Sequence, residues 1–158
     1  MFEQIIFFLI MDKVNTLPFS KKFEAERKLF NGGPGDIPIV HTVYDIYVSW
    51  NEIILKFPKS QRYTLGETCS KYILTILENL LFAASAGEIS EKLPKLKTVS
   101  AEIDTLKLLV RLAKDCKCIA NNQYQKIESL LNETGKMLGG WIKSFGKGNE
   151  NEDEKEHL

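Results

Sequence analysis

The sequence IPIVHTVYDIYVSWNEIILKFP, residues 37–58, decides the fold class of this chain. Its large apolar side chains recur at alternating steps of three and four residues, as they do along one side of an α-helix. The stripe consists of Val40, Val43, Tyr47, Trp50, Ile54 and Phe57. Asp36 precedes it as a candidate N-cap, Pro38 suits the first turn, and Pro58 ends the segment. Residues 37–58 therefore predict an amphipathic helix with one buried side.

A second helix is expected after Thr64-Leu-Gly-Glu67, a capping-box pattern in which the two outer side chains bind each other's backbone N–H groups. Its predicted buried face contains Leu65, Cys69, Tyr72, Ile73, Ile76, Leu77, Leu80 and Ala84. Gly87 is placed to end this helix in a left-handed conformation. Ser90 then follows as the predicted N-cap of a third helix.

The third and fourth helices have stripes of their own. The stripe of the third consists of Val99, Ile103, Leu106, Val110 and Ala113, flanked by Leu108, Leu109 and Leu112. The fourth helix starts at Asn121 or Asn122, and its near-heptad stripe is Tyr124, Ile127, Leu131, Leu138, Trp141 and Phe145. No segment has the alternation of a strand. Four amphipathic helices with short connections predict an all-α, up-down-up-down four-helix bundle.

Two breaks in composition divide the chain into three parts. Asn31-Gly-Gly-Pro-Gly-Asp36 cannot continue a helix, so residues 1–36 are expected to form a flexible N-terminal extension and linker. The bundle domain then covers residues 37–147. Residues 148–158 hold five acidic residues and one lysine, with too few apolar side chains to fold, and are expected to be a disordered acidic tail.

The chain begins with an apolar run from Ile5 to Met11 that is too short to span a membrane, which needs about 20 residues. Translation that begins at Met11 is the favoured explanation, and a short helix that docks on the bundle or on a partner is the alternative. The three cysteines are an odd number without a Cys-x-x-Cys pair, which indicates a reducing, cytoplasmic setting.

The formal net charge of zero conceals an uneven distribution. Residues 37–147 contain 15 Lys and Arg against 11 Asp and Glu, a net +4, whereas residues 148–158 carry one against five, a net −4. The remaining residues, 1–36, contain five of each sign. The domain expected to fold is thus basic, and the acidic tail masks it in the total.

Candidate catalytic and metal-binding groups are scarce. His41 and His157 are the two histidines, too few for a catalytic dyad or a His-rich metal cluster. Cys116 and Cys118 are two positions apart, which directs their side chains to different faces of a helix. The chain also has no Walker A motif and no dinucleotide fingerprint. We therefore expect a protein that is not an enzyme and that uses no cofactor and no metal.

Basic residues recur on the predicted helix surfaces. Lys107, Arg111 and Lys114 are spaced to share one side of the third helix, with Lys117 beside them. Further basic residues are Lys59, Arg62 and Lys71 around the start of the second helix and Lys136, Lys143 and Lys147 late in the fourth. An ordinary solvated surface is one explanation of such a stripe. The other is binding to nucleic-acid phosphates without readout of base sequence.

Three glycines, Gly135, Gly139 and Gly140, lie next to Trp141 in the fourth helix. Each costs a soluble helix about 1 kcal/mol relative to alanine, which a close helix–helix approach or a contact between subunits would explain. The second, third and fourth helices also have apolar faces wider than one inward seam requires, which favours an oligomer over a monomeric bundle with generous packing.

Three segments resemble one family of proteins. They are Phe57-Pro-Lys-Ser-Gln-Arg-Tyr-Thr-Leu-Gly66, Leu106-Lys-Leu-Leu-Val-Arg-Leu-Ala113 and Met137-Leu-Gly-Gly-Trp-Ile-Lys143. Together, and in this order, they are similar to the accessory variability determinant (Avd) proteins of diversity-generating retroelements. The same superfamily includes the four-helix-bundle proteins encoded in ribosomal RNA intervening sequences.

The resemblance implies a homopentameric barrel of positively charged bundles that binds nucleic acid and the reverse transcriptase of the retroelement. This partner enzyme copies template RNA into the mutagenised cDNA used in retrohoming. By motif, Lys107 and Arg111 match two basic positions of the family's third helix, and Lys143 matches a basic position after its Gly-Trp. The alternative is a stand-alone bundle of the intervening-sequence type, which the neighbouring genes would distinguish.

Overall fold

A computed structural model of the 158-residue chain describes the backbone of residues 33–153 and, apart from Pro34, the side chains up to Phe145. The chain forms two units, Met1–Asp36 and Ile37–Leu158. In the first unit the described residues contain one short 3-10 turn, η2 (Pro34–Asp36). The expectations for the N-terminal extension and for the run from Ile5 to Met11 lie outside the described residues.

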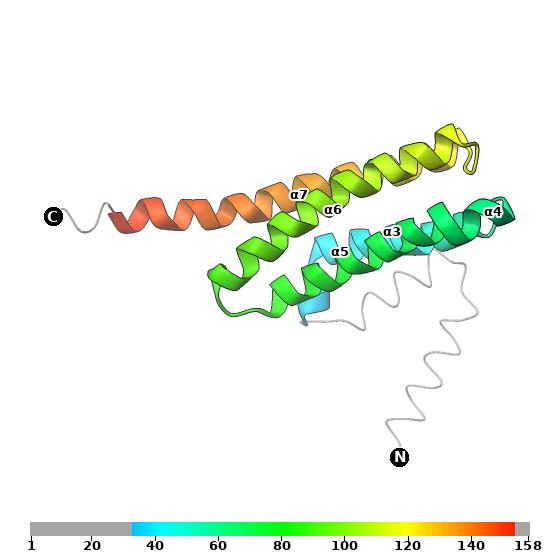
Figure 1. The fold of residues 1–158 in the computed structure, drawn as a ribbon. Coiled ribbons are helices and arrows are strands. Elements are labelled where there is room, and N and C mark those ends of the chain that lie inside the picture. Colours follow the sequence, from blue (N-terminus) through cyan, green and yellow to red (C-terminus); the bar gives the residue numbers. More distant parts are fainter. Residues whose placement is uncertain (1–32, 154–158) are drawn as a thin grey trace, which may run out of the picture. The chain divides into compact units, whose positions relative to one another are not determined.

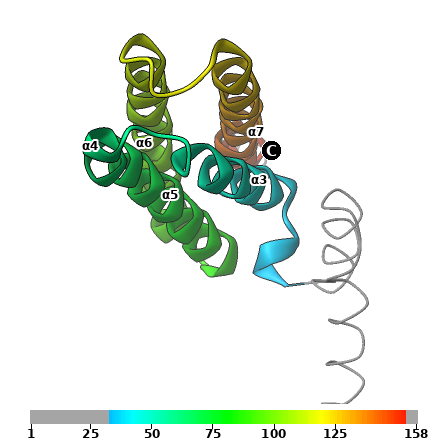
Figure 2. The ribbon, with the colours of Figure 1, turned by 90° about the vertical axis from the view of Figure 1, so that its right-hand side faces the viewer.

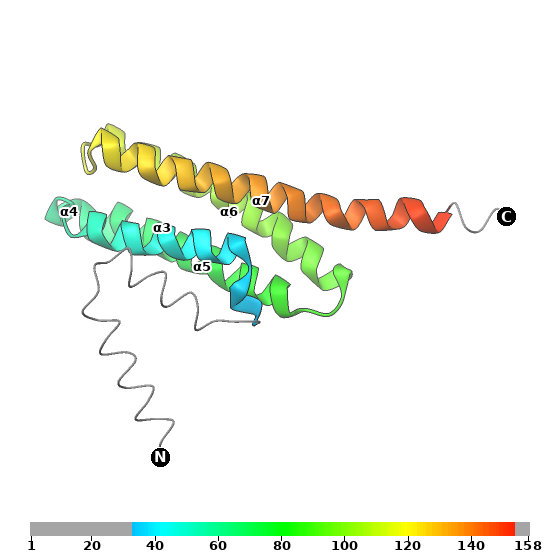
Figure 3. The same cartoon turned by 180° about the vertical axis from the view of Figure 1, so that it is seen from behind.

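The second unit contains four long helices: α3 (Pro38–Ile54), α5 (Glu67–Ser85), α6 (Ile89–Asp115) and α7 (Asn121–Asp153). Successive helices run in opposite directions (Figures 1 and 3), and α3 packs against α5 and α7 while α6 packs against the same two (Figure 2). The described residues, 33–153, include no strand. The predicted all-α, up-down-up-down four-helix bundle is confirmed.

The core takes residues from all four helices. The predicted stripe of α6 is confirmed in full, because Val99, Ile103, Leu106, Val110 and Ala113 are all buried. On α3 the buried face is centred differently from the predicted stripe, with Ile39, Ile46 and Ile53 inside the core while Tyr47 and Ile54 are half-buried. On α7, Ile127, Leu131 and Leu138 are buried and Tyr124, Trp141 and Phe145 pack at the margin.

The predicted N-caps of the first and third helices are wrong. Asp36 lies in η2, and the N-cap of α3 is Ile37, followed by Pro38 in the first turn as expected. Helix α6 likewise starts before Ser90, with Glu88 in extended conformation as its N-cap. Neither N-cap residue makes a side-chain hydrogen bond, so burial of the apolar faces fixes these two starts without help from a capping side chain.

The predicted boundaries of the second helix are also wrong. A helical path already starts after Pro58, through α4 (Lys59–Gln61) and the π-helix η3 (Arg62–Gly66), and leads directly into α5. Thr64 lies inside this path, where its hydroxyl donates back to the Ser60 carbonyl at 3.3 Å instead of capping a new helix. At the other end, Ala86 leaves α5 in extended conformation with φ −61° and ψ 142°, so a left-handed stop at Gly87 is not used.

The corner between α3 and α5 is built around Trp50, which is completely buried. Its indole Nε1 donates a hydrogen bond to the Gly66 carbonyl at 3.1 Å, and its ring meets that of Phe57 edge-on at 5.5 Å. A Cβ at Gly66 would lie 2.9 Å from two atoms of Ile54. A side chain at Gly66 would therefore force Ile54 to shift, next to the hydrogen bond that the indole makes.

A polar contact fixes how α5 and α6 lie against each other. Asn79 is largely buried, and its Nδ2 donates to both carboxylate oxygens of Glu102 at 3.2 Å. Lys95 Nζ donates to Asn79 Oδ1 at 3.3 Å and lies 5.2 Å from the centre of the Phe82 ring. A sliding or rotation of one helix would leave the buried amide unpaired, so these contacts favour a single register.

Helix α6 ends in a Schellman motif with a lysine at the position that glycine usually takes. Lys117 has φ 58°, its N–H bonds to the Lys114 carbonyl at 2.9 Å, and the N–H of Cys118 bonds to the Ala113 carbonyl at 2.8 Å. Lys117 thus follows Cys116, the C-cap of α6, and holds the left-handed turn into α7.

The backbone of α7 continues as a helix to Asp153, beyond residue 147, where the bundle domain was expected to end. Residues 154–158 lie outside the described part of the chain. The expected disordered tail thus covers a stretch that begins as a continuation of α7.

We predict that Gly66→Ala lowers the free energy of unfolding by about 1–3 kcal/mol, because the new methyl group overlaps Ile54 and pushes the Trp50 acceptor away. Gly139→Ala is the matched control, since that glycine is also helical but nothing lies within 4 Å of its added Cβ. The control should gain about 0.5–1 kcal/mol from helix propensity. Urea unfolding followed by circular dichroism measures both, and equal midpoints for the two variants would contradict this account of the corner.

A second prediction concerns the left-handed turn at Lys117. Lys117→Gly should raise the free energy of unfolding by about 1 kcal/mol, because glycine adopts positive φ without the steric cost of a Cβ. Lys117→Ala removes the same charge but keeps the Cβ, so its unfolding midpoint should not rise. A gain of equal size in both variants would assign the effect to charge and not to backbone strain.

Candidate functional site: the groove between α6 and α7

A groove lies along the bundle where α6 and α7 separate. Figures 1 and 3 show α6 starting away from α7 and approaching it toward the connection that joins them. The residues that line the groove are Ser100, Ile103, Asp104 and Lys107 of α6 and Asn132, Gly135, Lys136 and Leu138 of α7. Its floor is apolar, its rim is polar, and two of its rim residues are lysines.

The basic stripe of α6 faces this groove. Lys107 lines it directly. One helical turn further, Arg111 is exposed and acts electrostatically on Tyr124 of α7, and Lys114 Nζ lies 4.5 Å from the centre of the same tyrosine ring. The predicted spacing of Lys107, Arg111 and Lys114 therefore brings their three charges to the side of α6 that borders α7.

Tyr124 and Glu128 set the electrostatics of the upper groove. The tyrosine hydroxyl donates to Glu128 Oε1 at 2.8 Å, and this bond is the main reason why the pKa of Tyr124 is raised. The phenol thus stays neutral at physiological pH and holds the carboxylate, while the Lys114 ammonium rests on its ring. Lys114 is half-buried in this contact, which makes it part of the helix packing as well as of the basic surface.

The charges around the groove are mixed, with cations in excess. Lys107 and Lys136 line the groove together with Asp104. Around Tyr124, Arg111 and Lys114 are accompanied by Glu128 and Asp115. The groove is therefore a basic surface with spaced acidic points, and its exposed cations, above all Arg111, are the ones placed to meet an anion.

The glycines of α7 have a different surrounding from the one expected. A Cβ at Gly139 or Gly140 would meet nothing within 4 Å, and one at Gly135 would meet only Lys107 Nζ at 3.8 Å. Close approach of two helices within one chain is thus not the reason for them. Gly135 instead leaves room at the groove, and the Lys107 ammonium lies beside this space. Trp141 is half-buried against the core.

The other predicted basic residues do not join the stripe. Arg62 is committed to the fold, because its Nη2 donates to the carbonyls of Leu55 at 2.7 Å and Phe57 at 3.3 Å, at the end of α3. Lys59 and Lys117 are exposed on α4 and on the α6–α7 connection, two elements that lie at the same end of the bundle (Figures 1 and 3). Lys71 is exposed on α5 and Lys143 late on α7, each apart from the others.

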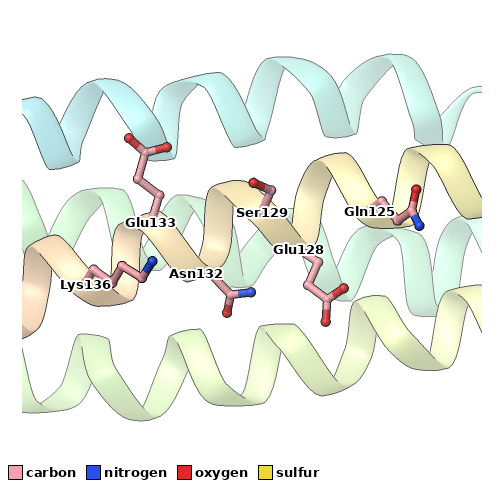
Figure 4. Close-up of a pocket in the computed structure, with 6 residues that line it drawn as sticks. All are labelled: Gln125, Glu128, Ser129, Asn132, Glu133 and Lys136. Atoms are coloured by element: carbon pink, nitrogen blue, oxygen red, sulfur yellow. The ribbon is translucent and has the colours of Figure 1, made fainter.

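A second depression lies on the outer side of α7 and shares Asn132 and Lys136 with the groove. Its other lining residues are Gln125, Glu128, Ser129 and Glu133. In Figure 4, Glu128 and Glu133 leave the helix on opposite sides, so the two carboxylates do not converge. A divergent pair of this kind offers neither a metal site nor a general acid and base acting on one substrate.

The remaining reactive groups of the described residues are no better placed for chemistry. Among the side chains that the structure describes, which end at Phe145, no three His, Cys, Asp or Glu residues come together in a way that could hold a metal ion. Burial raises the pKa of the Cys69 thiol to about 12 and also raises that of Cys118, which disfavours the nucleophilic thiolate at neutral pH. Within the same part of the chain, no helix has the length and apolar character needed to cross a membrane.

Sequence reasoning missed the second wall of the site. Asn132 and Gly135 were not assigned to it, and Tyr124 was assigned only to the core stripe. Spacing within one helix shows which residues share a side, but it does not show which residues of another helix lie opposite. The one available signal was the glycine content of α7, whose meaning depends on what surrounds each glycine.

Comparison with known proteins agrees with this architecture. A family model described as bAvd-like matches residues 39–145, a range that includes most of α3 and α7 and all of the two helices between them. A search of curated proteins gives no match. The matched range holds the three segments in which the sequence resembles Avd proteins, so that interpretation is confirmed. The chain therefore belongs to the bAvd-like family.

Proposed function

We propose that this Avd-like accessory protein serves a diversity-generating retroelement without being an enzyme itself. In this proposal it binds template RNA or cDNA together with the retroelement reverse transcriptase, through basic surfaces of an oligomeric bundle, and so supports mutagenic retrohoming. The family assignment supports the accessory role in general. The observation that carries the nucleic-acid part is the row of Lys107, Arg111 and Lys114 beside an open groove.

The spacing of this row suits a phosphate backbone better than a compact ligand. The three cations follow each other along about two turns of α6, a length of about 10 Å, so they can contact successive phosphates. Cations of this kind neutralise phosphates and carry no information on base sequence, so we expect binding through the row to depend little on sequence. Glu128 and Asp104 limit the attraction, so we expect affinity to be moderate and strongly dependent on salt.

The oligomeric part of the proposal is supported by surfaces that the single bundle leaves uncovered. Leu108 and Leu112, the flanking leucines of α6, are 67% and 46% exposed, far more than the stripe residues beside them. On α7, the open space above Gly139 and Gly140 would admit a helix of a neighbouring copy. A homopentamer is the oligomer that the resemblance implies, and we carry that number over as part of the proposal.

We predict that Lys107→Gln/Arg111→Gln weakens binding to RNA and cDNA with little dependence on sequence. The slope of log affinity against log salt should fall by about 0.7 to 0.9 for each phosphate that is no longer neutralised. Fluorescence anisotropy over a series of salt concentrations measures both quantities. Lys97→Gln/Lys126→Gln is the matched control, because it removes the same charge from exposed positions outside the groove. If the two double variants behave alike, net charge and not the groove determines binding.

The same pair of variants tests the partner enzyme. Co-purification with the reverse transcriptase separates two arrangements: retention of the enzyme by Lys107→Gln/Arg111→Gln would place it on another surface, and joint loss would place both partners on the groove. Wild-type protein that binds neither nucleic acid nor the reverse transcriptase would contradict the proposed function.

A further prediction addresses the oligomer through Gly139→Leu. Within one chain this side chain meets open space, so helicity should be preserved and the unfolding midpoint of the isolated bundle should not fall. If the glycine side of α7 contacts another copy, the added volume should disrupt that contact and lower the mass measured by light scattering. Lys126→Leu adds a similar side chain at an exposed position of α7 and should leave the mass unchanged. An unchanged mass in both variants would exclude this side of α7 from the interface.

A further inference from the structure

The end of the bundle that carries α4 exposes an aromatic ring among basic residues. Tyr63 of η3 is 68% exposed, which makes it one of the most exposed large apolar side chains among the described residues. Lys59 precedes it by four residues on the same helical path, and Lys56 is exposed just before that path begins. From residue 53 to residue 66 the chain contains three basic residues and no acidic residue, and Glu52 and Glu67 lie directly on either side of this stretch.

The fold accounts for the other distinctive residues of this segment but not for Tyr63 and Lys59. Phe57 is buried against Trp50, Gly66 supplies the acceptor for the indole, and Arg62 binds the carbonyls at the end of α3. Tyr63 and Lys59, by contrast, are directed to solvent. Replacement of an exposed tyrosine changes the free energy of unfolding little. The stability of the fold therefore does not explain why this ring lies outside the core.

Tyr63 and Lys59 lie on one side of a rigid helical segment. Residues four apart are neighbours on such a helical path, so the ring and the ammonium share a side, which Glu67, four residues after Tyr63, borders in turn. The hydroxyl of Thr64 binds the carbonyl of Ser60, and the Trp50–Gly66 hydrogen bond holds the far end of η3. The ring is therefore presented by a fixed backbone and not by a loose loop.

We propose that Tyr63 is a stacking platform for an unpaired base of single-stranded nucleic acid, with Lys59 and Lys56 neutralising the adjacent phosphates. An exposed ring preceded by two exposed lysines matches the chemistry of a flexible strand, whose bases offer flat faces and whose backbone is anionic. A duplex is excluded from this contact because its bases are already stacked on each other. The α6–α7 connection, which carries the exposed Lys117, lies at the same end of the bundle (Figure 2).

This inference rests on the proposed nucleic-acid function and adds a site distinct from the α6–α7 groove. The groove offers charge, which acts on any phosphate backbone, whereas the α4 end offers a ring, which acts on unpaired bases. The two contributions are separable by experiment, because removal of a charge changes the salt slope of binding and removal of a stacked ring does not.

The test uses the full chain and unstructured oligonucleotides of one sequence, made as RNA and as DNA, with a blunt duplex of the same sequence for comparison. Tyr63→Ala should bind the single strands about five- to hundredfold more weakly than wild type at constant salt, with an unchanged salt slope. Tyr63→Phe keeps the ring and should bind within about twofold of wild type. Duplex binding should not change in either variant, and circular dichroism should show unaltered helicity.

Leu55→Ala is the matched control for apolar contact, since Leu55 is 70% exposed near the same corner but has no ring. Its binding to both single strands should equal that of wild type. Lys56→Gln/Lys59→Gln should lower the salt slope by about 0.7 for each phosphate that the two lysines neutralise in the wild type. Weaker binding of Tyr63→Ala to either the RNA or the DNA strand supports the proposal.

Four results would overturn it. If Tyr63→Ala and Leu55→Ala lose affinity equally, this end of the bundle is an apolar docking surface for a protein. The same conclusion follows if Tyr63→Ala no longer binds the reverse transcriptase but still binds nucleic acid. Single-strand binding by Tyr63→Ala at wild-type affinity would remove the stacking platform and leave the groove proposal standing. If the wild-type protein binds no nucleic acid at all, both the stacking platform and the groove proposal are wrong.

Discussion

The buried N–H of Trp50 is the constraint on which the first half of the bundle depends. An indole in the core needs an acceptor, since leaving its N–H unpaired would cost about 1–3 kcal/mol. The acceptor is the carbonyl of Gly66, a residue of the next helical path, and it is reachable because no Cβ keeps Ile54 away. This one hydrogen bond ties α3 to the start of α5, directs η3, and leaves Tyr63 on the outside of the corner.

Periodicity was sufficient to predict the helices and most of their buried sides, because apolar residues three and four positions apart lie on the same side of an α-helix. The stripe from Val99 to Ala113 is the clearest case. The ends of the helices were predicted poorly. Thr64 and Ser90 have the right side chains for caps, yet both lie inside helices whose starts are fixed by packing and, before α4, by Pro58. A cap pattern states what a residue can do locally, and tertiary packing decides whether it is used.

The residues that α6 contributes to the candidate site were predictable from the sequence, but the residues of α7 that lie opposite them were not. The shared side of Lys107, Arg111 and Lys114 follows from their spacing, whereas the position of Tyr124 opposite Lys114 depends on how α7 returns beside α6. The same limit explains Arg62, which has the composition of a binding residue but closes the end of α3. For Gly139, the sequence predicted a close contact with another helix or subunit. The structure shows that no atom from elsewhere in the chain lies within 4 Å of a Cβ built at this position.

The π-helix at Arg62–Gly66 also affects which insertions and deletions the fold tolerates. A π-turn contains one residue more than the α-helical turn that it replaces. Loss of one codon in this stretch would remove the extra residue and restore a regular α-helical turn, with the helix after it still in phase. Cys69, Ile73 and Ile76 would then keep their buried positions. Loss of one codon in the middle of α5 would instead rotate the residues after it by about 100°, whereas the extended link at residues 86–88 can vary in length without turning any buried side chain outward.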